Sequence, residues 1–339
     1  MTLLAVVKSF VILLSSVSIA GNTLVCFIIL GSVPMRTTMN YLLLNLAILD
    51  ILTGLLALPV VTIFSSFSTG PIDHSGVNHT LSSSSMVGDL VCKIRPLFWL
   101  SGSVSPLFLV VIAYERFIVV TRPLNTICGI SDRKLCIIIA GCWGLGSALQ
   151  VPDLVAVSYH GDGMCSYGAE DSWFSREWFA GVLTVVIFVV PSTVIVILYV
   201  KVVRCLTSGS EQIGLQAVAK TARDKRYMRI TKMIIIITLI FIICWGFCYI
   251  SFLVEQLVDV PYSDILLHTK HLMMCVNSCA NPFIYFIFFR SFREKIQKMT
   301  MACLCWRRKD YKVNVHNKAL RTIGTENMAL SCVYITRET

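Results

Sequence analysis

Apolar and polar residues alternate along the chain in long blocks, with seven apolar stretches separated by short polar segments. Each stretch can cross the roughly 30 Å hydrocarbon core of a bilayer, which takes about 20 apolar residues in an α-helix. The pattern predicts an all-α membrane protein, a bundle of seven transmembrane helices. Their expected ranges are approximately 3–30, 41–64, 97–120, 135–157, 178–199, 233–254 and 265–289.

A shorter helix is predicted directly after the seventh stretch, at 290–301. Its apolar residues share one stripe and its basic residues lie away from that stripe, which is typical of a helix lying in the membrane interface. Cys303 and Cys305 follow this helix and are candidate palmitoylation sites, with two ordinary reduced thiols as the alternative. We expect 1–301 to form one transmembrane domain and 302–339 to be a disordered cytoplasmic tail.

Composition supports a membrane protein, and the distribution of charge predicts its orientation in the membrane. The chain is 56% hydrophobic and 14% charged, with a mean hydropathy of +0.76, which is too apolar for a soluble domain. If the N-terminus is extracellular, most of the 29 Lys and Arg fall on the cytoplasmic side, as the positive-inside rule requires. The net charge of +10 then indicates attraction to anionic lipid rather than to nucleic acid. The exceptions are Lys8, Lys93, Arg95, Arg176 and Lys270.

Three residues in the predicted extracellular segments are candidates for covalent modification. Cys92 precedes the third helix and Cys165 lies between the fourth and fifth, outside the apolar stretches that hold most of the other cysteines. Because the extracellular side permits oxidation, a disulfide between them is predicted. Asn78 begins an Asn-His-Thr sequon in a long Ser-rich segment on the same side, so it is a predicted glycosylation site.

Asp50 lies near the centre of the second apolar stretch. A carboxylate at that depth costs roughly 2.5–3.5 kcal/mol on insertion scales, so it is expected to face the bundle interior and to have a partner or a function. Taken singly, other polar or helix-breaking residues in the stretches have simple structural explanations. Asn22 can bond a neighbouring helix, and Pro59 and Pro106 can kink theirs.

The order of these residues along the chain is more informative than any one of them. Each apolar stretch carries one motif: Gly21-Asn22, Leu44–Asp50, Glu115-Arg116-Phe117, Trp143, Pro191 with Tyr199, Phe241 with Cys244-Trp245, and Asn281-Pro282 with Tyr285. With these motifs the chain resembles the rhodopsin-like (class A) family of G-protein-coupled receptors, and the resemblance spans all seven helices.

The resemblance implies a switch for G-protein coupling at the cytoplasmic ends of the helices. Arg116 is expected to be held at rest by Glu115 and to enter the G-protein cavity when active. The remaining switch residues implied by the family are Tyr199, Phe241, Trp245, Asn281, Pro282 and Tyr285. Two departures from the family stand out: Tyr227 replaces a second acidic restraint, and Phe247 replaces the proline that kinks the sixth helix.

The resemblance also implies a polar cluster around Asp50 that holds a sodium ion. Carboxylate, hydroxyl and amide oxygens are suitable ligands for a hard cation. A water-filled hydrogen-bond cluster without an ion is the alternative, and no other cofactor is expected. The implied members are Asn22, Asp50, Ser105, Asn277, Ser278 and Asn281, with Asp50 and Ser105 as the sodium ligands.

Residues that this chain lacks exclude two classes of ligand. No acid lies between Cys92 and Glu115 to pair with a monoamine, and Cys275 stands where opsins have the retinal lysine. Phe98 and Trp99 mark a candidate ligand mouth, and the segment 277–279 looks most like peptide receptors of the family. A neuropeptide is therefore the first expectation, and a small lipid or nucleoside-like ligand is the alternative.

The predicted function is that of a plasma-membrane receptor, with its C-terminus in the cytoplasm, that transmits ligand binding to a heterotrimeric G protein. Arrestin and a receptor kinase are further expected partners. A non-signalling decoy receptor shares the same fold, and a transporter or channel is the rival outside the class. An enzyme is not predicted, because Asp50 is the only acid well inside the apolar stretches and no zinc or nucleophile motif lies there.

Overall fold

A computed structural model describes residues 3–62, 90, 92–94, 96–121, 130–159, 165–167, 176–207, 215–258 and 263–301. The chain divides into two compact units, Met1–Phe288 and Phe289–Thr339. The elements of the first unit are α1 (Leu3–Leu30), η1 (Val33–Met35), α2 (Thr38–Thr62), α4 (Leu100–Thr121), α5 (Asp132–Ala148), α6 (Val151–Ala156), β1 (Val157–Tyr159), β2 (Cys165–Tyr167), α7 (Arg176–Leu183), η4 (Thr184–Val189), α8 (Val190–Thr207), α9 (Leu215–Leu257) and α10 (Asp264–Phe288).

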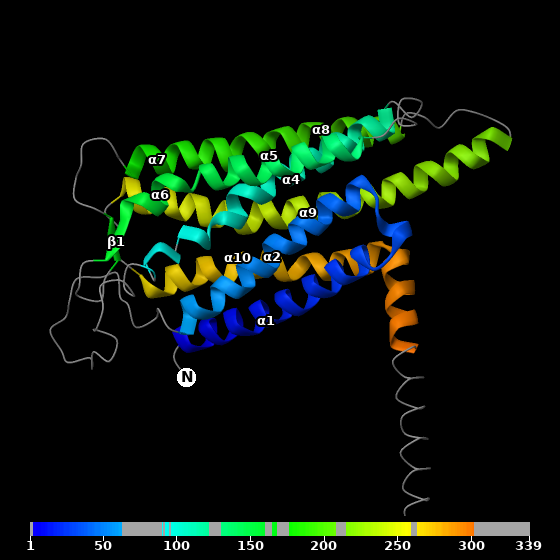
Figure 1. The fold of residues 1–339 in the computed structure, drawn as a ribbon. Helices are drawn as coiled ribbons and strands as arrows, with labels where there is room; N and C mark the ends of the chain where they lie inside the picture. The colour runs from blue at the N-terminus through cyan, green and yellow to red at the C-terminus, as the bar shows by residue number, and fades with distance from the viewer. Residues whose placement is uncertain are drawn as a thin grey trace, which may run out of the picture. The chain divides into compact units, whose positions relative to one another are not determined.

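Seven helical segments in the described part of the chain are long and apolar enough to cross a membrane, which confirms the predicted spans. They run alongside one another, with the β1–β2 hairpin at one end of the first unit and the first turns of α9 projecting at the other (Figure 1). α1 begins at the hairpin end, so an odd number of crossings carries the chain to the opposite end by the close of α10.

Several helix bounds differ from the prediction. α2 begins at Thr38 rather than at 41, and α4 begins at Leu100 rather than at 97. The fourth span is two helices, α5 and α6, because Pro152 near the start of α6 has no N–H to continue the hydrogen bonds of α5. The fifth span continues to Thr207, and α9 begins well before 233. Hydropathy reports only the part inside the bilayer, whereas good helix formers such as Ala, Lys and Arg extend these helices beyond it.

The hairpin was not predicted. β1 pairs with β2 in antiparallel register, with Tyr159 opposite Cys165. Each strand has only three residues, too short for an alternating pattern to stand out. Lys93 supports this end of the bundle, because its ammonium donates to the main-chain carbonyls of Leu154 (2.7 Å), Val155 (3.2 Å) and Val157 (2.5 Å).

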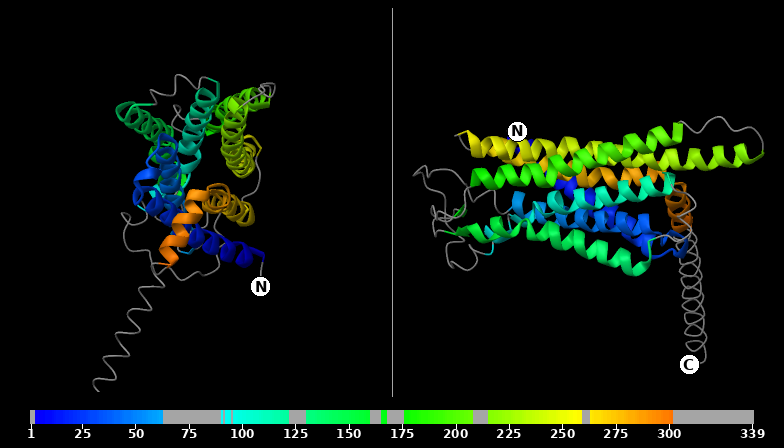
Figure 2. Two further views of the ribbon diagram at one scale, coloured as in Figure 1. Left: turned by 90° about the vertical axis from the view of Figure 1, so that its right-hand side faces the viewer. Right: turned by 90° about the horizontal axis from the view of Figure 1, so that it is seen from above.

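α9 joins two groups of helices within the bundle, one of α1, α2 and α10 and the other of α4, α5 and α8. α1 contacts α2 and α10, while α4 contacts α5 and α8, and α9 packs against both α10 and α8 (Figure 2). Between α5 and α4 the approach is close at Gly146, where an added Cβ would lie 2.5 Å from Cγ2 and 2.9 Å from Cα of Val104. The Trp143 indole donates from Nε1 to Asn45 Oδ1 (2.9 Å), which ties α5 to α2.

The surface of the bundle has the polarity of a membrane protein. Large apolar side chains such as Ile137, Ile197 and Ile243 are exposed, whereas Asn22, Asp50 and other polar residues are buried. The interior is mainly apolar, as in a soluble protein, but the outside also presents large apolar side chains, which suits contact with hydrocarbon.

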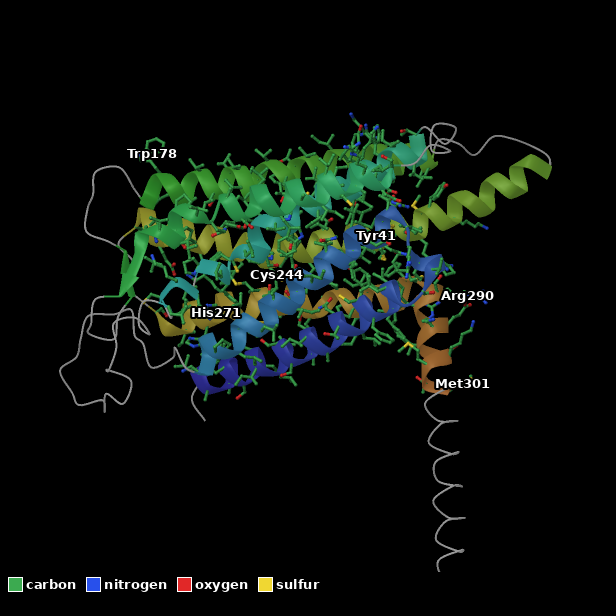
Figure 3. The ribbon with its side chains drawn as sticks, viewed as in Figure 1. Tyr41, Trp178, Cys244, His271, Arg290 and Met301 are labelled. Atoms are coloured by element: carbon green, nitrogen blue, oxygen red, sulfur yellow. The ribbon has the colours of Figure 1, made fainter. Side chains whose placement is uncertain are left out.

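The described part of the second unit is a helix at 290–301. Phe292 is buried and its ring stacks on that of Phe289, with ring centroids 5.5 Å apart. On the exposed side, Arg290 Nε donates to Glu294 Oε1 (2.6 Å). Figure 3 labels both ends of this helix. The predicted tail, with Cys303 and Cys305, lies outside the described residues.

Candidate functional site

Asp50 is buried in α2 and bonded to α10. The Asn281 amide donates from Nδ2 to Asp50 Oδ2 (2.7 Å), and the Ser18 hydroxyl of α1 donates to the Asp50 main-chain carbonyl (3.2 Å). The ion pairs recorded among the described residues do not include Asp50. The carboxylate therefore lies in the interior with neutral polar partners from α1 and α10.

Asn22 links its own helix, α1, to α10. Its Nδ2 donates to the main-chain carbonyl of Ser278 in α10 (3.1 Å) and to that of Ser18 (2.9 Å). Two oxygens here, Asn22 Oδ1 and Ser278 Oγ, are buried and have no hydrogen-bond partner among the described residues. Asn277 is also buried in α10. The cluster thus contains buried polar oxygens together with a carboxylate.

Ser105, the predicted α4 member of this cluster, is buried and shares a hydrogen bond with the Ser101 hydroxyl (3.3 Å). Ser18 is a member that the sequence reasoning missed. The signal was present, because Ser15, Ser18 and Asn22 follow one another at helical spacing on one face of α1, and all three are buried. Ser15 contacts α10, because its Oγ lies 3.4 Å from Cys275 Sγ.

Arg116 and Glu115 form a two-point ion pair near the end of α4. Arg116 Nε and Nη2 donate to Glu115 Oε2 (2.5 Å) and Oε1 (2.8 Å). Both side chains are about nine-tenths buried, so water screens the pair weakly. The partner is the predicted one, and among the described residues no second acid is recorded in an ion pair with Arg116.

The tyrosines of the predicted switch, Tyr199 in α8 and Tyr285 in α10, are both buried. The Tyr199 hydroxyl has no hydrogen-bond partner among the described residues. The ammonium of Lys201 in α8 lies 6.0 Å from the ring centroid of Phe117, the residue after Arg116 in α4.

An aromatic column runs along the inner face of α9. The ring centroids of Phe241 and Trp245 are 6.4 Å apart, and those of Trp245 and Tyr249 are 5.8 Å apart. Trp99, the residue before α4, has its ring centroid 6.1 Å from those of both Trp245 and Tyr249. The column therefore connects the predicted ligand mouth at Trp99 with two predicted switch residues. Tyr249 is an addition from the structure, one helical turn beyond Trp245.

The other mouth residue, Phe98, is buried with its ring edge-on to His271 of α10 at 4.9 Å. Nearby, Lys270 Nζ donates to Glu255 Oε2 (2.6 Å) and Oε1 (2.9 Å), which joins α10 to α9. Trp178 in α7 is 78% exposed and points away from the bundle (Figure 3).

The comparison with protein families agrees with this geometry. Residues 21–285 match the family model described as "7 transmembrane receptor (rhodopsin family)". The chain belongs to this family. It is a G-protein-coupled receptor, and the family is one of signalling receptors rather than enzymes.

Individual relatives of the receptor cover most of its length. Neuropeptide FF receptor 1 of Rattus norvegicus is 28% identical over 87% of this chain and 70% of its own. Neuropeptide FF receptor 2 of Mus musculus is 26% identical over 88% of this chain and 73% of its own. The RYamide receptor of Tribolium castaneum is 25% identical over 90% of this chain and 83% of its own.

The receptor's predicted modification sites are only partly within the described residues. Cys92 is buried and disulfide-bonded, and Cys165 opens β2; their pairing with each other stays a prediction. Asn78 lies outside the described residues. α9 is a continuous α-helix of 43 residues with no proline in it, and Phe247 lies within it.

Proposed function

We propose that this receptor binds an extracellular peptide and acts from the plasma membrane, with its N-terminus outside and its C-terminus in the cytoplasm. The names of the relatives support a peptide ligand, since they include receptors for neuropeptide FF, RYamide, tachykinin-like peptides and somatostatin. The observation that carries the signalling part is the buried two-point pair of Arg116 with Glu115.

The pair supports assigning this structure to the resting form of the receptor. Charge-assisted hydrogen bonds to a partly buried carboxylate are worth about 1.5–3 kcal/mol each, and Arg116 makes two of them at rest. A ligand activates the receptor by binding more tightly to the state in which Arg116 is released. The aromatic column from Trp99 to Phe241 is the packed route by which the ligand mouth affects α9.

The family resemblance implies two acids in the resting lock, and this chain has one of them, Glu115. Tyr227 is half-buried in α9 and carries no charge to pair with Arg116. We therefore expect measurable basal activity. Tyr227→Glu is expected to lower it, and equal basal exchange by the variant and the wild type contradicts this expectation.

A sodium ion is a fitting occupant of the cluster around Asp50. The carboxylate supplies the charge, and Ser278 Oγ and Asn22 Oδ1 are buried oxygens with no described partner. Asp50, Ser105 and Ser278 would hold the ion, which would supply a positive charge that stabilises the resting packing of α2 against α10. Cofactors beyond this ion are not part of the proposal.

Four further features complete the proposal. Cys92 pairs with Cys165, Asn78 carries a glycan, and Cys303 and Cys305 carry palmitoyl chains. A receptor kinase and arrestin bind the tail at 302–339, whose sequence contains Ser and Thr residues that a kinase can phosphorylate.

The test is ligand-independent nucleotide exchange on a panel of purified G proteins at matched surface expression. Arg116→Ala is expected to abolish the basal exchange of the wild type, and Asp50→Asn is expected to change it and to remove its dependence on sodium. Arg133→Ala, an exposed arginine at the start of α5, is the matched control and is expected to behave as the wild type. Equal exchange by Arg116→Ala and Arg133→Ala refutes the role of Arg116.

A further inference from the structure

Lys270 is a buried cation near the predicted ligand mouth. Its ammonium donates to both carboxylate oxygens of Glu255, at 2.6 and 2.9 Å. The Lys270 side chain is 5% exposed, whereas that of Glu255 is 27% exposed. A buried ammonium is costly without a counter-ion, whereas a partly solvated carboxylate can move into water at little cost. Lys270 is therefore the fixed partner of the pair, and Glu255 is the replaceable one.

A second contact holds Lys270 in place through its main chain. Cys248 Sγ donates to the main-chain carbonyl of Lys270 (3.6 Å), and both residues are buried. Cys248 and Glu255 are seven residues apart in α9, a spacing that places them on one face of the helix. Lys270 therefore keeps a contact with α9 when the Glu255 side chain turns away.

The residues beside Lys270 favour an anion over a cation. His268 and His271 are also buried, so three of the four residues at 268–271 are buried basic residues. The ion pairs recorded among the described residues place one acid here, Glu255. A cation that arrived from outside would have to share Glu255 with Lys270. An anion can instead take the place of Glu255 and leave the charge of the site unchanged.

Aromatic rings lie close to the pair. Phe252 precedes Glu255 by three residues in α9, and its ring centroid is 5.7 Å from that of Trp99. Residues three apart are neighbours on the surface of a helix. Trp99 and Phe252 are each partly exposed, so their rings can contact a ligand. The site combines a fixed cation with aromatic surfaces.

We propose that the ligand carries a carboxylate that displaces Glu255 and binds the Lys270 ammonium, and that an apolar group next to this carboxylate contacts Trp99 and Phe252. One carboxylate replaces another on Lys270, and Glu255 enters water with its charge intact. Because the two ionic contacts nearly cancel, the net affinity comes from the apolar group. The proposal rests on the proposed function, since it names the chemical class of the ligand at the same mouth.

The first measurement uses the purified wild type and needs no G protein. The receptor carries 5-fluorotryptophan, with the Trp99 resonance assigned by Trp99→Phe, and ionic strength is held constant with chloride. N-acetylphenylalanine supplies a carboxylate beside an aromatic ring, and N-acetylphenylalaninamide is the matched probe without the charge. The carboxylate is expected to shift the Trp99 resonance in a saturable way, at a concentration at least about tenfold below that of the neutral amide.

The second measurement identifies the protein groups by thermal unfolding with the same probes. Glu255→Gln leaves Lys270 without a counter-ion, so N-acetylphenylalanine is expected to raise its midpoint at a concentration at least about tenfold lower than the wild type needs. Lys270→Met is expected not to respond. Glu294→Gln removes an exposed acid by the same chemical change, and this control is expected to respond as the wild type.

Glu255→Asp keeps the measurement informative if Glu255→Gln does not fold. Its shorter side chain keeps the charge but holds Lys270 less well, so its response is expected to lie between those of Glu255→Gln and the wild type. Two dipeptides then distinguish the sources of the carboxylate. Tighter binding of N-acetyl-Asn-Phe with a free carboxylate supports a peptide C-terminus, and tighter binding of N-acetyl-Asp-Phe amide supports an acidic side chain.

The outcomes separate this proposal from the proposed function. Equal binding of the carboxylate and the neutral amide overturns the anchor, and so does a response that persists in Lys270→Met. Phenylalaninamide carries an ammonium in place of the carboxylate; if it binds more tightly than N-acetylphenylalanine, the ligand class is wrong. Carboxylate binding without nucleotide exchange on any G protein supports the anchor and counts against the proposed coupling. Exchange that depends on Arg116, without carboxylate binding, leaves the coupling in place and overturns the anchor.

Discussion

The ion pair between Lys270 and Glu255 allows a sharp prediction, because its two partners are unequally buried. The Lys270 side chain is 5% exposed and that of Glu255 is 27% exposed, with Nζ–Oε distances of 2.6 and 2.9 Å. Removing Glu255 leaves a buried ammonium without its counter-ion. Removing Lys270 leaves a carboxylate that can turn toward water. We therefore predict that Glu255→Gln destabilises the receptor more than Lys270→Met does.

The magnitudes follow from this difference in burial. Breaking a fully buried pair by removing one partner costs roughly 3–5 kcal/mol. The Lys270 ammonium approaches that limit, so Glu255→Gln is expected to cost about 3 kcal/mol. The solvated part of Glu255 reduces the penalty of Lys270→Met to about 1 kcal/mol. The double variant has no buried charge without a partner. It is expected to recover most of the lost stability, because the effects of neighbouring substitutions are not additive.

Thermal unfolding in one detergent, at fixed protein concentration, ranks the stability of the wild type, Glu255→Gln, Lys270→Met and the double variant. Glu294→Gln removes the exposed ion pair with Arg290, whose side chains are 79% and 51% exposed, and is the control with a loss below about 1 kcal/mol. If Lys270→Met is the more destabilised single variant, or if the double variant is worse than both, the reasoning from burial is wrong.

Three further predictions use contacts within the bundle. Gly146→Ala is expected to destabilise the receptor by about 1–3 kcal/mol in thermal unfolding, because its methyl would meet the α4 backbone, whereas Gly141→Ala has open space and is expected to be neutral or stabilising. Trp143→Phe loses the indole hydrogen bond to α2 and is expected to cost about 1 kcal/mol in the same assay; an unchanged midpoint contradicts it. Glu115→Gln weakens the hold on Arg116, so basal exchange is expected to rise up to about tenfold for each 1.4 kcal/mol lost, and a fall in exchange refutes the lock.

The seven spans were predictable because the thickness of a bilayer sets the length of each apolar stretch. The contacts of Asp50 with Asn281 and of Arg116 with Glu115 also agree with the sequence reasoning. These residues are recognisable because a buried charge needs a partner, and the family motifs name that partner. The roles of these residues in signalling stay predictions for the experiments above.

Other features depend on how each helix is rotated about its axis, which no local pattern specifies. The π-helical turn η4 directs Phe188 toward Gly246 of α9, yet the run Thr184–Val189 is an ordinary apolar run in the sequence. Gly102 is one small residue among several in its helix, and only the position of Trp245, whose Cε3 would lie 2.5 Å from an added Cβ, distinguishes it. Such contacts arise from packing between helices and are absent from hydropathy.

The length of α9 has a mechanical consequence. The helix runs without a break from Leu215 to Leu257, and Trp245 lies nearer to the second end. At 1.5 Å per residue, about 45 Å of helix extends from Trp245 toward Leu215 and about 18 Å toward Leu257. A rigid lever with those arms multiplies displacement about 2.5-fold, so a push of about 1 Å at the short arm sweeps the long arm through about 2.5 Å. The ratio of the two displacements is then set by how far along α9 Trp245 lies.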